Sequence, residues 1–311
     1  MKRLLSLLIH NLQVYLKTLI LKNFRNFKEL EAHFSDHLNV FYGENAQGKT
    51  NLLEAIYFVS TGRSLRTNLL KELIREKESY FRIEAEVIRD EVPQRIQITY
   101  DGHTKGLKID GNTYGSFHPL LGILPTVLYT PYDIQLITGS PTERRRFLNI
   151  ELAQSDPLYV HHLTIYWRAM KQRNCLLRKK SLDAIESWEK QMVNSAEYIT
   201  QARVEMIETL KDPLAKEAKS LSSEEHDLSL SLSAAKDYLK QLQKNRSREM
   251  ELGVTLNGPH RDDIALYIDQ SLARTKASEG QKKTMIAALK LAEWERLSNR
   301  IDEPALMGLT I

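Results

Sequence analysis

One stretch of eight residues carries the clearest chemistry in the chain. It fits the pattern G-x-x-x-x-G-K-[ST] and reads Gly43-Glu44-Asn45-Ala46-Gln47-Gly48-Lys49-Thr50. Its two glycines allow successive N–H groups to point at one anion, and the start of a following helix adds partial positive charge. Lys49 is suited to neutralise the β- and γ-phosphates of a nucleotide, and Thr50 to offer its hydroxyl to Mg²⁺. The stretch therefore predicts a nucleotide-binding loop.

The sequence on either side of this loop predicts the elements that hold it. Before it, the short apolar run Leu38 to Tyr42 favours a strand. After it, apolar residues recur at positions i, i+3, i+4 and i+7, as on one face of a helix. These residues are Leu52, Ala55, Ile56 and Val59. The expected order is strand, glycine loop and helix, which is the context that the pattern requires.

A second candidate anion site lies more than 200 residues further on. Ser278-Glu279-Gly280-Gln281 precedes a helical pattern formed by Met285, Ala288, Leu289 and Ala292. Ser278 is suited to cap this helix, and Gly280 allows close approach of a ligand. The alternative is that Ser278 is only an N-cap.

Several groups of basic residues are candidates for contact with nucleic-acid phosphates. They are Arg144, Arg145 and Arg146, then Lys171, Arg173, Arg178, Lys179 and Lys180, and finally Lys236, Lys240, Lys244, Arg246 and Arg248. Lys236, Lys240 and Lys244 share one stripe if their segment is helical, and like charges in a stripe repel unless a polyanion neutralises them. The alternatives are a solvated helix face and, for the three arginines, pairing with carboxylates or with nucleotide phosphate.

The turn Gly258-Pro259-His260-Arg261-Asp262-Asp263 is a further candidate site. A rigid Gly-Pro turn would display His260 and Arg261, near the nucleotide or at a dimer seam. A purely structural turn explains the sequence equally well.

Composition indicates a globular protein without a strong overall charge. The chain has 311 residues, of which 42% are hydrophobic and 27% charged, and 44 basic and 40 acidic residues leave a net charge of +4. A nucleic-acid surface must therefore be a local patch. The single cysteine, Cys175, cannot form an internal disulfide, so we expect the protein to be located in the reducing cytoplasm. No apolar run is long enough to span a bilayer, and no membrane partner is expected.

Hydrophobic periodicity divides the chain into four parts. Residues 1–14 look like a non-native N-terminal extension, residues 15–138 are rich in strand patterns, and residues 139–250 predict an extended helical arm. Within the arm, we expect Asp212-Pro213 to end a helix, Ser220 to Ser233 to form a polar connection and Ala234 to Arg248 to form a basic helix. Residues 251–311 return to strand-like sequence. We expect residues 15–138 to form the N-terminal part of a nucleotide-binding lobe, and residues 251–311 to form its C-terminal part, which is incomplete. The predicted class is α/β.

With these motifs in place, the chain resembles the RecF family of the ABC/SMC ATPase superfamily. The resemblance runs from about Tyr15 to the last residue. Besides the loop and the Ser278 motif, it rests on these stretches: Leu21-Lys22-Asn23-Phe24-Arg25-Asn26-Phe27, Asn51-Leu52-Leu53-Glu54, Gly139-Ser140-Pro141-Thr142-Glu143-Arg144-Arg145-Arg146, Lys171-Gln172-Arg173-Asn174 and Gly258-Pro259-His260-Arg261. It implies an ABC-type P-loop ATPase lobe, built on a mixed β-sheet with helices, and an inserted helical arm.

The resemblance also implies function. ATP and Mg²⁺ would bind to the loop, with Asn51 as part of the site, and Ser278 to Gln281 of one copy would close over ATP held by a second copy. Partners implied are single-stranded or gapped DNA, a homodimer that depends on ATP, and a RecR-type mediator protein. The implied role is to aid recombinase loading in DNA repair and replication.

Two departures from the family pattern bear on catalysis. Asn149 stands where the family usually has aspartate. The final run, Leu306 to Ile311, sits where the Walker B strand belongs, but the two acidic residues that should follow it are missing, and Asp302 and Glu303 would lie at the wrong end of that strand. We therefore expect nucleotide binding with slow or no hydrolysis, in either a fragment of a longer protein or a degenerate ATPase. A nucleotide-gated DNA scaffold and another SMC-like repair ATPase remain alternatives.

Overall fold

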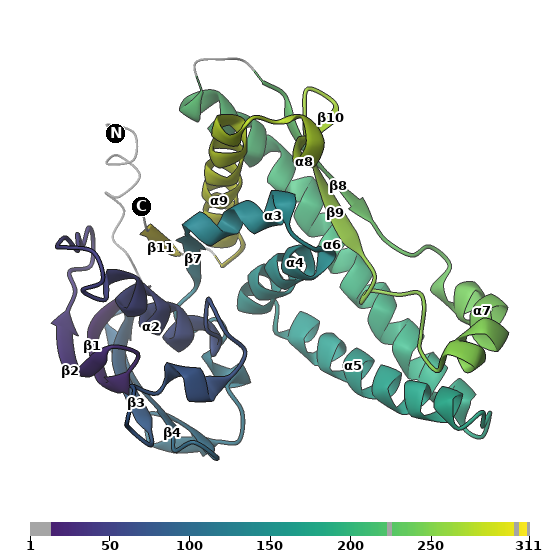
Figure 1. Ribbon diagram of the computed structural model, residues 1–311, viewed down its shortest axis with the longest axis horizontal. Coiled ribbons are helices and arrows are strands. Elements are labelled where there is room, and N and C mark those ends of the chain that lie inside the picture. Colours follow the sequence, from purple (N-terminus) through teal and green to yellow (C-terminus); the bar gives the residue numbers. More distant parts are fainter. Residues whose placement is uncertain (1–13, 223–225, 302–304, 310–311) are drawn as a thin grey trace. The chain divides into compact units, whose positions relative to one another are not determined.

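The computed structural model describes residues 14–222, 226–301 and 305–309, and it confirms a mixed α/β protein with a central sheet and long helices (Figure 1). By their contacts the residues form two compact units, one comprising the chain up to Pro131 together with the part from Leu297, the other Tyr132–Arg296. Each unit is described by itself below. The predicted extension, residues 1–14, lies outside the described residues except for Val14, which begins strand β1.

The first unit contains a six-stranded antiparallel sheet in the order β2-β1-β3-β4-β5-β6. Its strands are β1 (Val14–Phe24), β2 (Phe27–His33), β3 (Phe81–Arg89), β4 (Val92–Tyr100), β5 (Lys105–Ile109) and β6 (Asn112–Tyr114). The period-2 pattern of β3 predicts a half-buried strand, and the structure confirms it, since Phe81, Ile83, Ala85 and Val87 are all buried. Asp110-Gly111, a residue pair typical of hairpin turns, joins β5 to β6, and Gly111 has a φ of +84° there.

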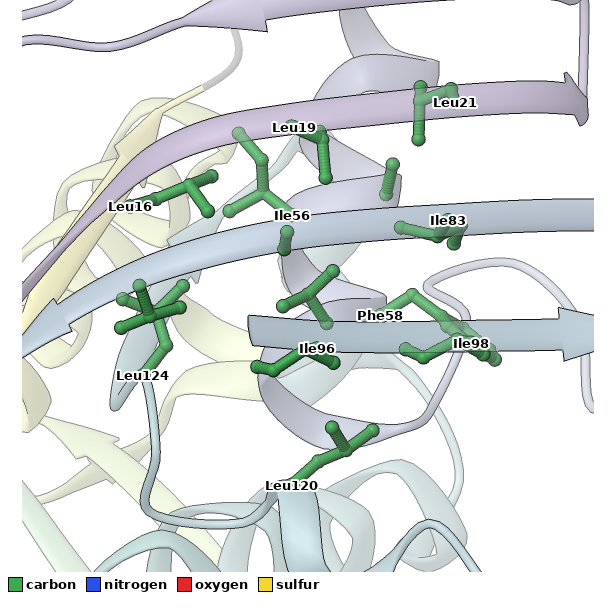
Figure 2. Packing of buried hydrophobic residues seen from close by; sticks show 14 of the residues in the cluster. Leu16, Leu19, Leu21, Ile56, Phe58, Ile83, Ile96, Ile98, Leu120 and Leu124 are labelled. Atoms are coloured by element: carbon green, nitrogen blue, oxygen red, sulfur yellow. The ribbon is translucent and has the colours of Figure 1, made fainter. Parts of the chain in front are cut away.

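Helix α2 (Lys49–Thr61) packs against this sheet and supplies the other half of the core. Figure 2 shows Ile56 and Phe58 of α2 among Leu19 and Leu21 of β1, Ile83 of β3 and Ile98 of β4. The four apolar residues that predict the helix, Leu52, Ala55, Ile56 and Val59, are buried as expected. The core thereby fixes the direction in which the helix leaves the glycine loop.

The strand predicted for Leu38 to Tyr42 is not present, and we correct that prediction. These residues have no strand assignment, and Leu38, Val40 and Tyr42 are 60%, 70% and 92% exposed. The run has no neighbouring strand among the described residues, and an apolar segment becomes a strand only when another strand supplies its hydrogen bonds. A separate two-stranded parallel sheet joins β7 (Thr126–Tyr129) to β11 (Leu306–Leu309), so the final apolar run does form a strand.

The second unit is mainly helical. It contains α3 (Gln135–Thr138), α4 (Pro141–Ser155), α5 (Pro157–Arg178), α6 (Ile185–Leu221), α7 (Tyr238–Leu252), α8 (Ala273–Lys276) and most of α9 (Glu279–Ile301), with a three-stranded sheet in the order β10-β9-β8. Its strands are β8 (Leu228–Ser233), β9 (Asp263–Ile268) and β10 (Ser271–Leu272). Short 3-10 helices span Leu70–Leu73 and His118–Leu120 in the first unit and Pro131–Ile134 at the boundary between the two units in sequence. The predicted helical arm thus corresponds to α4, α5, α6 and α7.

Three expectations for the arm need correction. Helix α6 does not end at Asp212-Pro213 but continues for a total of 37 residues, because Leu210, Leu214 and Ala218 are buried along one face and their packing offsets the hydrogen bond lost at Pro213. We expect a polar connection from Ser220 to Ser233, but the second half of this segment forms strand β8, which pairs with β9. Helix α7 begins at Tyr238, four residues later than expected, and leaves Lys236 outside it.

The contact-based division differs from the boundaries expected from sequence. Residues 132–138 and 251–296 belong by their contacts to the second unit, together with the helical arm. Strand β9 pairs with β8 and packs against α4, which explains why its segment groups with the arm.

Candidate nucleotide-binding site

The loop Gly43 to Thr50 has an open, exposed backbone that ends in a helix. Residues 43–47 are exposed, and Gly43, Ala46 and Gly48 have φ angles of +147°, +68° and +103°. A Cβ at Gly48 would lie 2.7 Å from atoms of Asn26 and Phe27, so this position requires glycine for space as well as for conformation. Helix α2 begins at Lys49, and the N–H groups of its first turn have no partner within the helix. These features together suit an anion.

The side chain of Lys49 lies across the loop that precedes it. Its Nζ atom donates to the carbonyl oxygen of Gly43 at 2.6 Å and to that of Glu44 at 2.8 Å. The positive charge is therefore held above the curled backbone by two acceptors with only partial negative charge. A phosphate oxygen is a stronger acceptor for an ammonium group than a carbonyl, so the lysine is suited to exchange these contacts for a phosphate.

The turn between β1 and β2 supports the loop from outside. Asn26 donates from Nδ2 to the carbonyl of Gln47 at 3.4 Å and accepts from Asn51 Nδ2 at 2.7 Å. Arg66 in turn donates to Asn51 Oδ1 at 3.2 Å. Asn51 therefore holds the loop through Asn26 in this structure. The sequence identifies Asn23 to Phe27 as part of the family resemblance, but it does not show that this stretch contacts the loop, because that contact depends on the tertiary fold.

A buried ion pair anchors the same turn to helix α2. Glu54 is fully buried and accepts from Arg25 through both of its oxygens, at 2.8 Å each. Ser64 Oγ also donates to Glu54, at 2.6 Å, and Arg25 reaches the carbonyl of Glu72. Sequence reasoning assigns no role to Arg25, Glu54 or Ser64, because they lie up to 39 positions apart in the chain. Together they fix the turn that carries Asn26.

The Ser278 motif, in the second unit, forms a reciprocal cap at the start of α9. Ser278 Oγ accepts from the backbone N–H of Gln281 at 3.2 Å, while Gln281 Oε1 accepts from the backbone N–H of Ser278 at 2.8 Å. Ser278, Glu279 and Gly280 are exposed, and a Cβ at Gly280 would meet only Ser278 Oγ, at 3.9 Å. The predicted capping role of Ser278 is confirmed, and the motif is open to a ligand.

The turn from Gly258 to Asp263 is held rigidly by its neighbours. Gly258 has a φ of +126°, and a Cβ there would lie 2.5 Å from the hydroxyl of Tyr166. That hydroxyl donates to His260 Nδ1 at 2.6 Å, while His260 Nε2 lies 3.1 Å from the carbonyl of Thr255 and donates to it. Burial lowers the pKa of His260 to about 4, so its ring is neutral near pH 7. Arg261 is exposed. The buried and hydrogen-bonded His260 fits a structural turn, while the exposed Arg261 fits a turn that displays a side chain to a ligand.

Two of the predicted DNA contacts are corrected, because their side chains lie inside the protein. Arg144 is buried and pairs with Asp263 through two hydrogen bonds of 2.7 and 2.9 Å, which is the carboxylate pairing considered as its alternative role. Arg173 is fully buried and contacts Glu189, Glu249 and Thr255. Both guanidinium groups are neutralised by protein carboxylates and are not available to a polyanion in this structure.

The remaining basic candidates differ in exposure. Arg145 and Arg146 are half-buried on α4, and Lys171 is exposed on α5, as are Arg178, Lys179 and Lys180 near its end. Lys236 is exposed but precedes α7, so it does not share a helical stripe with Lys240 and Lys244 as predicted. The stripe on α7 consists of Lys240, Lys244 and Arg248, which are exposed at spacings of four. Cys175, half-buried on α5, is a free thiol.

The described residues contain neither a cluster of metal-ligating side chains nor a membrane-spanning helix. No group of three or more His, Cys, Asp or Glu side chains in that part of the chain is arranged to hold a metal ion. None of its helices combines the length and the apolar character needed to cross a bilayer. Asp302 and Glu303, considered as carboxylates near β11, lie outside the described residues.

Comparison with known proteins connects these sites to one family. Residues 15–304 match the family model of AAA ATPase domains. DNA replication and repair protein RecF of Protochlamydia amoebophila is 44% identical over 301 residues, which cover 92% of this chain and 83% of that protein. RecF of Symbiobacterium thermophilum is 39% identical over 313 residues, covering 95% and 84%.

Solved structures agree with the sequence comparison. The structure of the recombination mediator protein RecF with ATP, from the RecFOR pathway, superposes with a TM-score of 0.90 at 31% identity and covers 96% of this chain and 85% of its own. The Smc head domain of Pyrococcus furiosus, at 16% identity and a TM-score of 0.53, shares the fold. The resemblance drawn from the motifs is confirmed: the chain belongs to the RecF family of DNA replication and repair proteins.

Proposed function

We propose that this chain binds ATP at residues 43–51 and acts in DNA replication and repair. The observation that carries the proposal is the placement of Lys49 Nζ across the loop at the start of α2, 2.6 and 2.8 Å from two carbonyls of the loop itself. Lys49, together with the N–H groups of the first helical turn, matches the charge of a triphosphate. Relatives named for this role and a RecF structure with ATP support the assignment.

Mg²⁺ would accompany the nucleotide, and the loop offers it one side-chain ligand. Thr50 is the second residue of α2 and provides a hydroxyl oxygen, which is a ligand type that Mg²⁺ accepts. Since no cluster of acidic ligands lies among the described residues, the ion would depend mainly on phosphate oxygens and water. Mg²⁺ commonly binds proteins in this way.

The Ser278 motif, residues Ser278 to Gln281, is called the signature motif from here on, and it gives the proposal a second component, an ATP-dependent homodimer. Ser278 and Gly280 of one copy would contact the γ-phosphate held by Lys49 of the other, which produces two sites at a two-fold interface. The exposed N-terminus of α9, capped by Ser278, supports this role. Binding of ATP would then favour the dimer by mass action.

The nucleic-acid partner would be single-stranded or gapped DNA, and a RecR-type mediator would be a protein partner. The exposed cations of α5 and α7 support contact with a polyanion. The RecF proteins of the related solved structures belong to the RecFOR pathway. The single cysteine is consistent with a cytoplasmic setting.

Replacement of Lys49 tests the nucleotide site directly. Lys49→Ala should weaken binding of ATP, measured by titration calorimetry or with a fluorescent analogue, by at least 10-fold, because a charge-assisted contact to phosphate is lost. Lys22→Ala, which removes an exposed lysine from β1, is the matched control and should bind ATP like the wild type. An unchanged affinity in Lys49→Ala would contradict the proposal.

A further inference from the structure

Helix α5 has an unusually one-sided charge. No Asp or Glu occurs from Pro157 to Leu182, a stretch that covers the entire helix and its end. Its exposed cations are Arg168, Lys171, Arg178, Lys179 and Lys180. Neighbouring like charges on a helix repel, and α5 has no acidic side chain of its own to offset that repulsion, so a bound polyanion would stabilise this surface.

An exposed tryptophan lies on the same helix. Trp167 is 46% exposed although large aromatic side chains are usually covered, and Lys171 follows it at a spacing of four, on the same face. The indole lies edge-on to the ring of His260, with centroids 6.4 Å apart and planes at 62°. Since His260 is itself fixed by Tyr166 and Thr255, the indole rests against a rigid support.

The turn that supports Trp167 also carries cations without matching carboxylates. Its two acidic residues are already engaged, Asp262 with Arg203 at 2.7 Å and Asp263 with Arg144 at 2.7 Å. Arg145 donates to the backbone carbonyl of Asp262 at 2.9 Å, so its guanidinium lies against the turn beside the exposed Arg261. Neither Arg145 nor Arg261 forms an ion pair with a carboxylate within the described part of the chain.

The electrostatic environment of the turn agrees with this geometry. Partial burial is the largest cause of the lowered pKa of Arg145. The carboxylates of Asp263 and Asp262 oppose this shift, while the nearby Arg203 and Arg261 add to it. The same positive neighbours add to burial in lowering the pKa of His260. An anion bound here would relieve the mutual repulsion of these groups.

We infer that Trp167, Arg145 and Arg261 form a binding site for single-stranded DNA, in which the indole stacks on an unpaired base and the two guanidinium groups bind the adjacent phosphates. The cations of α5 continue the backbone contact from Lys171 towards Lys180. Stacking selects single strands because the faces of the bases are covered in a duplex, and aromatic side chains in a positively charged groove bind single strands without strong sequence preference. This inference rests on the proposed role in DNA repair, and it identifies the residues that would contact single-stranded DNA in that role.

Two DNA probes separate stacking from charge. One is a labelled oligo(dT), and the other is an abasic strand of equal length, which has the phosphates without the bases. Binding of the full chain is followed by fluorescence anisotropy. Trp167→Ala should weaken binding to oligo(dT) by about 5- to 150-fold, which is the usual effect of losing a stacked base, and should change binding to the abasic strand little. Trp167→Phe should retain most of the affinity.

Matched controls exist on the same unit. Leu158→Ala removes an exposed apolar side chain from α5 and should leave oligo(dT) binding unchanged. Arg261→Ala should reduce the salt dependence of binding to both probes by about 0.7 in the slope of log K against log salt, as expected for one lost phosphate contact, while Lys219→Ala on α6 should not. Circular dichroism and ATP affinity, measured on every variant, report whether the fold is intact.

Two outcomes would overturn the inference while the proposed function stands. One is wild-type affinity of Trp167→Ala for oligo(dT), and the other is an equal loss on both probes. Displacement of oligo(dT) by polyglutamate as readily as by unlabelled oligo(dT) would also overturn it, because polyglutamate has charge without bases. If the wild type bound ATP but no DNA of any form, the proposed DNA role would fail as well, so the two failures are distinguishable.

Discussion

His226 Nε2 lies 3.1 Å from the amide nitrogen of Gln281, the last residue of the signature motif. The opposite side of the imidazole, Nδ1, lies 2.8 Å from Asp269. Gln281 Oε1 already accepts from Ser278, so the side-chain amide of Gln281 is oriented with its nitrogen towards His226 Nε2. A carboxylate, an imidazole and an amide thus orient the cap of α9.

We predict that His226→Ala weakens ATP-dependent dimerisation by about 2- to 10-fold at each signature site, since one orienting hydrogen bond is lost. His226→Gln, which can place an oxygen near the position of Nε2, should recover part of the effect. Sedimentation velocity with and without ATP measures the dimer, and Ser278→Arg serves as the fully disrupted reference. ATP affinity of the monomer should not change. Normal ATP-dependent dimerisation of His226→Ala would contradict the role of His226 in positioning Gln281.

The Arg25–Glu54 pair predicts a large loss of stability from a single change. Arg25→Ala leaves the fully buried Glu54 carboxylate without its cation and should lower the free energy of unfolding by about 3 to 5 kcal/mol. Arg25→Ala combined with Glu54→Gln should be less damaging than Arg25→Ala alone, because no buried charge remains. Urea denaturation measures both. Equal stabilities of the single and double variants would show that the pair is not coupled.

The buried His260 predicts a pH dependence of stability. The pKa of His260 in the folded protein, about 4, lies below the ordinary histidine value of 6.5, so between these pH values the unfolded chain binds a proton that the folded chain does not. Stability is therefore retained above pH 6.5 and decreases as the pH falls towards 4. Between pH 7 and pH 5 this one group should contribute a loss of about 2 kcal/mol.

The measurement compares wild type with His260→Gln by denaturant unfolding at several pH values. The difference in stability between the two should narrow as the pH falls from 7 to 5, since only the wild type loses the contribution of His260. His103→Gln, a change in the exposed turn after β4, controls for removing a histidine. A difference that stays constant with pH would contradict the assigned cause.

The stripe on α7 predicts an electrostatic contribution to DNA binding that does not depend on bases. Lys240→Gln combined with Lys244→Gln should weaken DNA binding and reduce the salt slope by about 1.4 to 1.8, if each lysine contacts one phosphate. Lys219→Gln combined with Lys211→Gln removes the same charge from α6 and is the control. Lys236→Gln alone tests whether the residue outside the helix takes part. An unchanged salt slope in the first variant would exclude this stripe as a phosphate contact.

What the sequence determined by itself is local. The glycine loop, helix α2 and the cap at Ser278 depend on residues within a few positions of one another, and the alternation in β3 follows directly from the period of a strand. Motifs of this kind predict the nucleotide site and the family, because the hydrogen bonds and the exposed backbone that define them are formed by neighbouring residues.

The tertiary structure decided which of several similar residues face solvent. Lys171 and Arg173 are two positions apart, yet one is exposed and the other fully buried between Glu189 and Glu249, because the side of α5 that meets α6 and α7 depends on distant segments. Leu38 to Tyr42 lacks a neighbouring strand, and α6 continues through Pro213 because packing supports it. Pairing, burial and ion pairs are formed between residues far apart in sequence, and periodicity alone does not determine them.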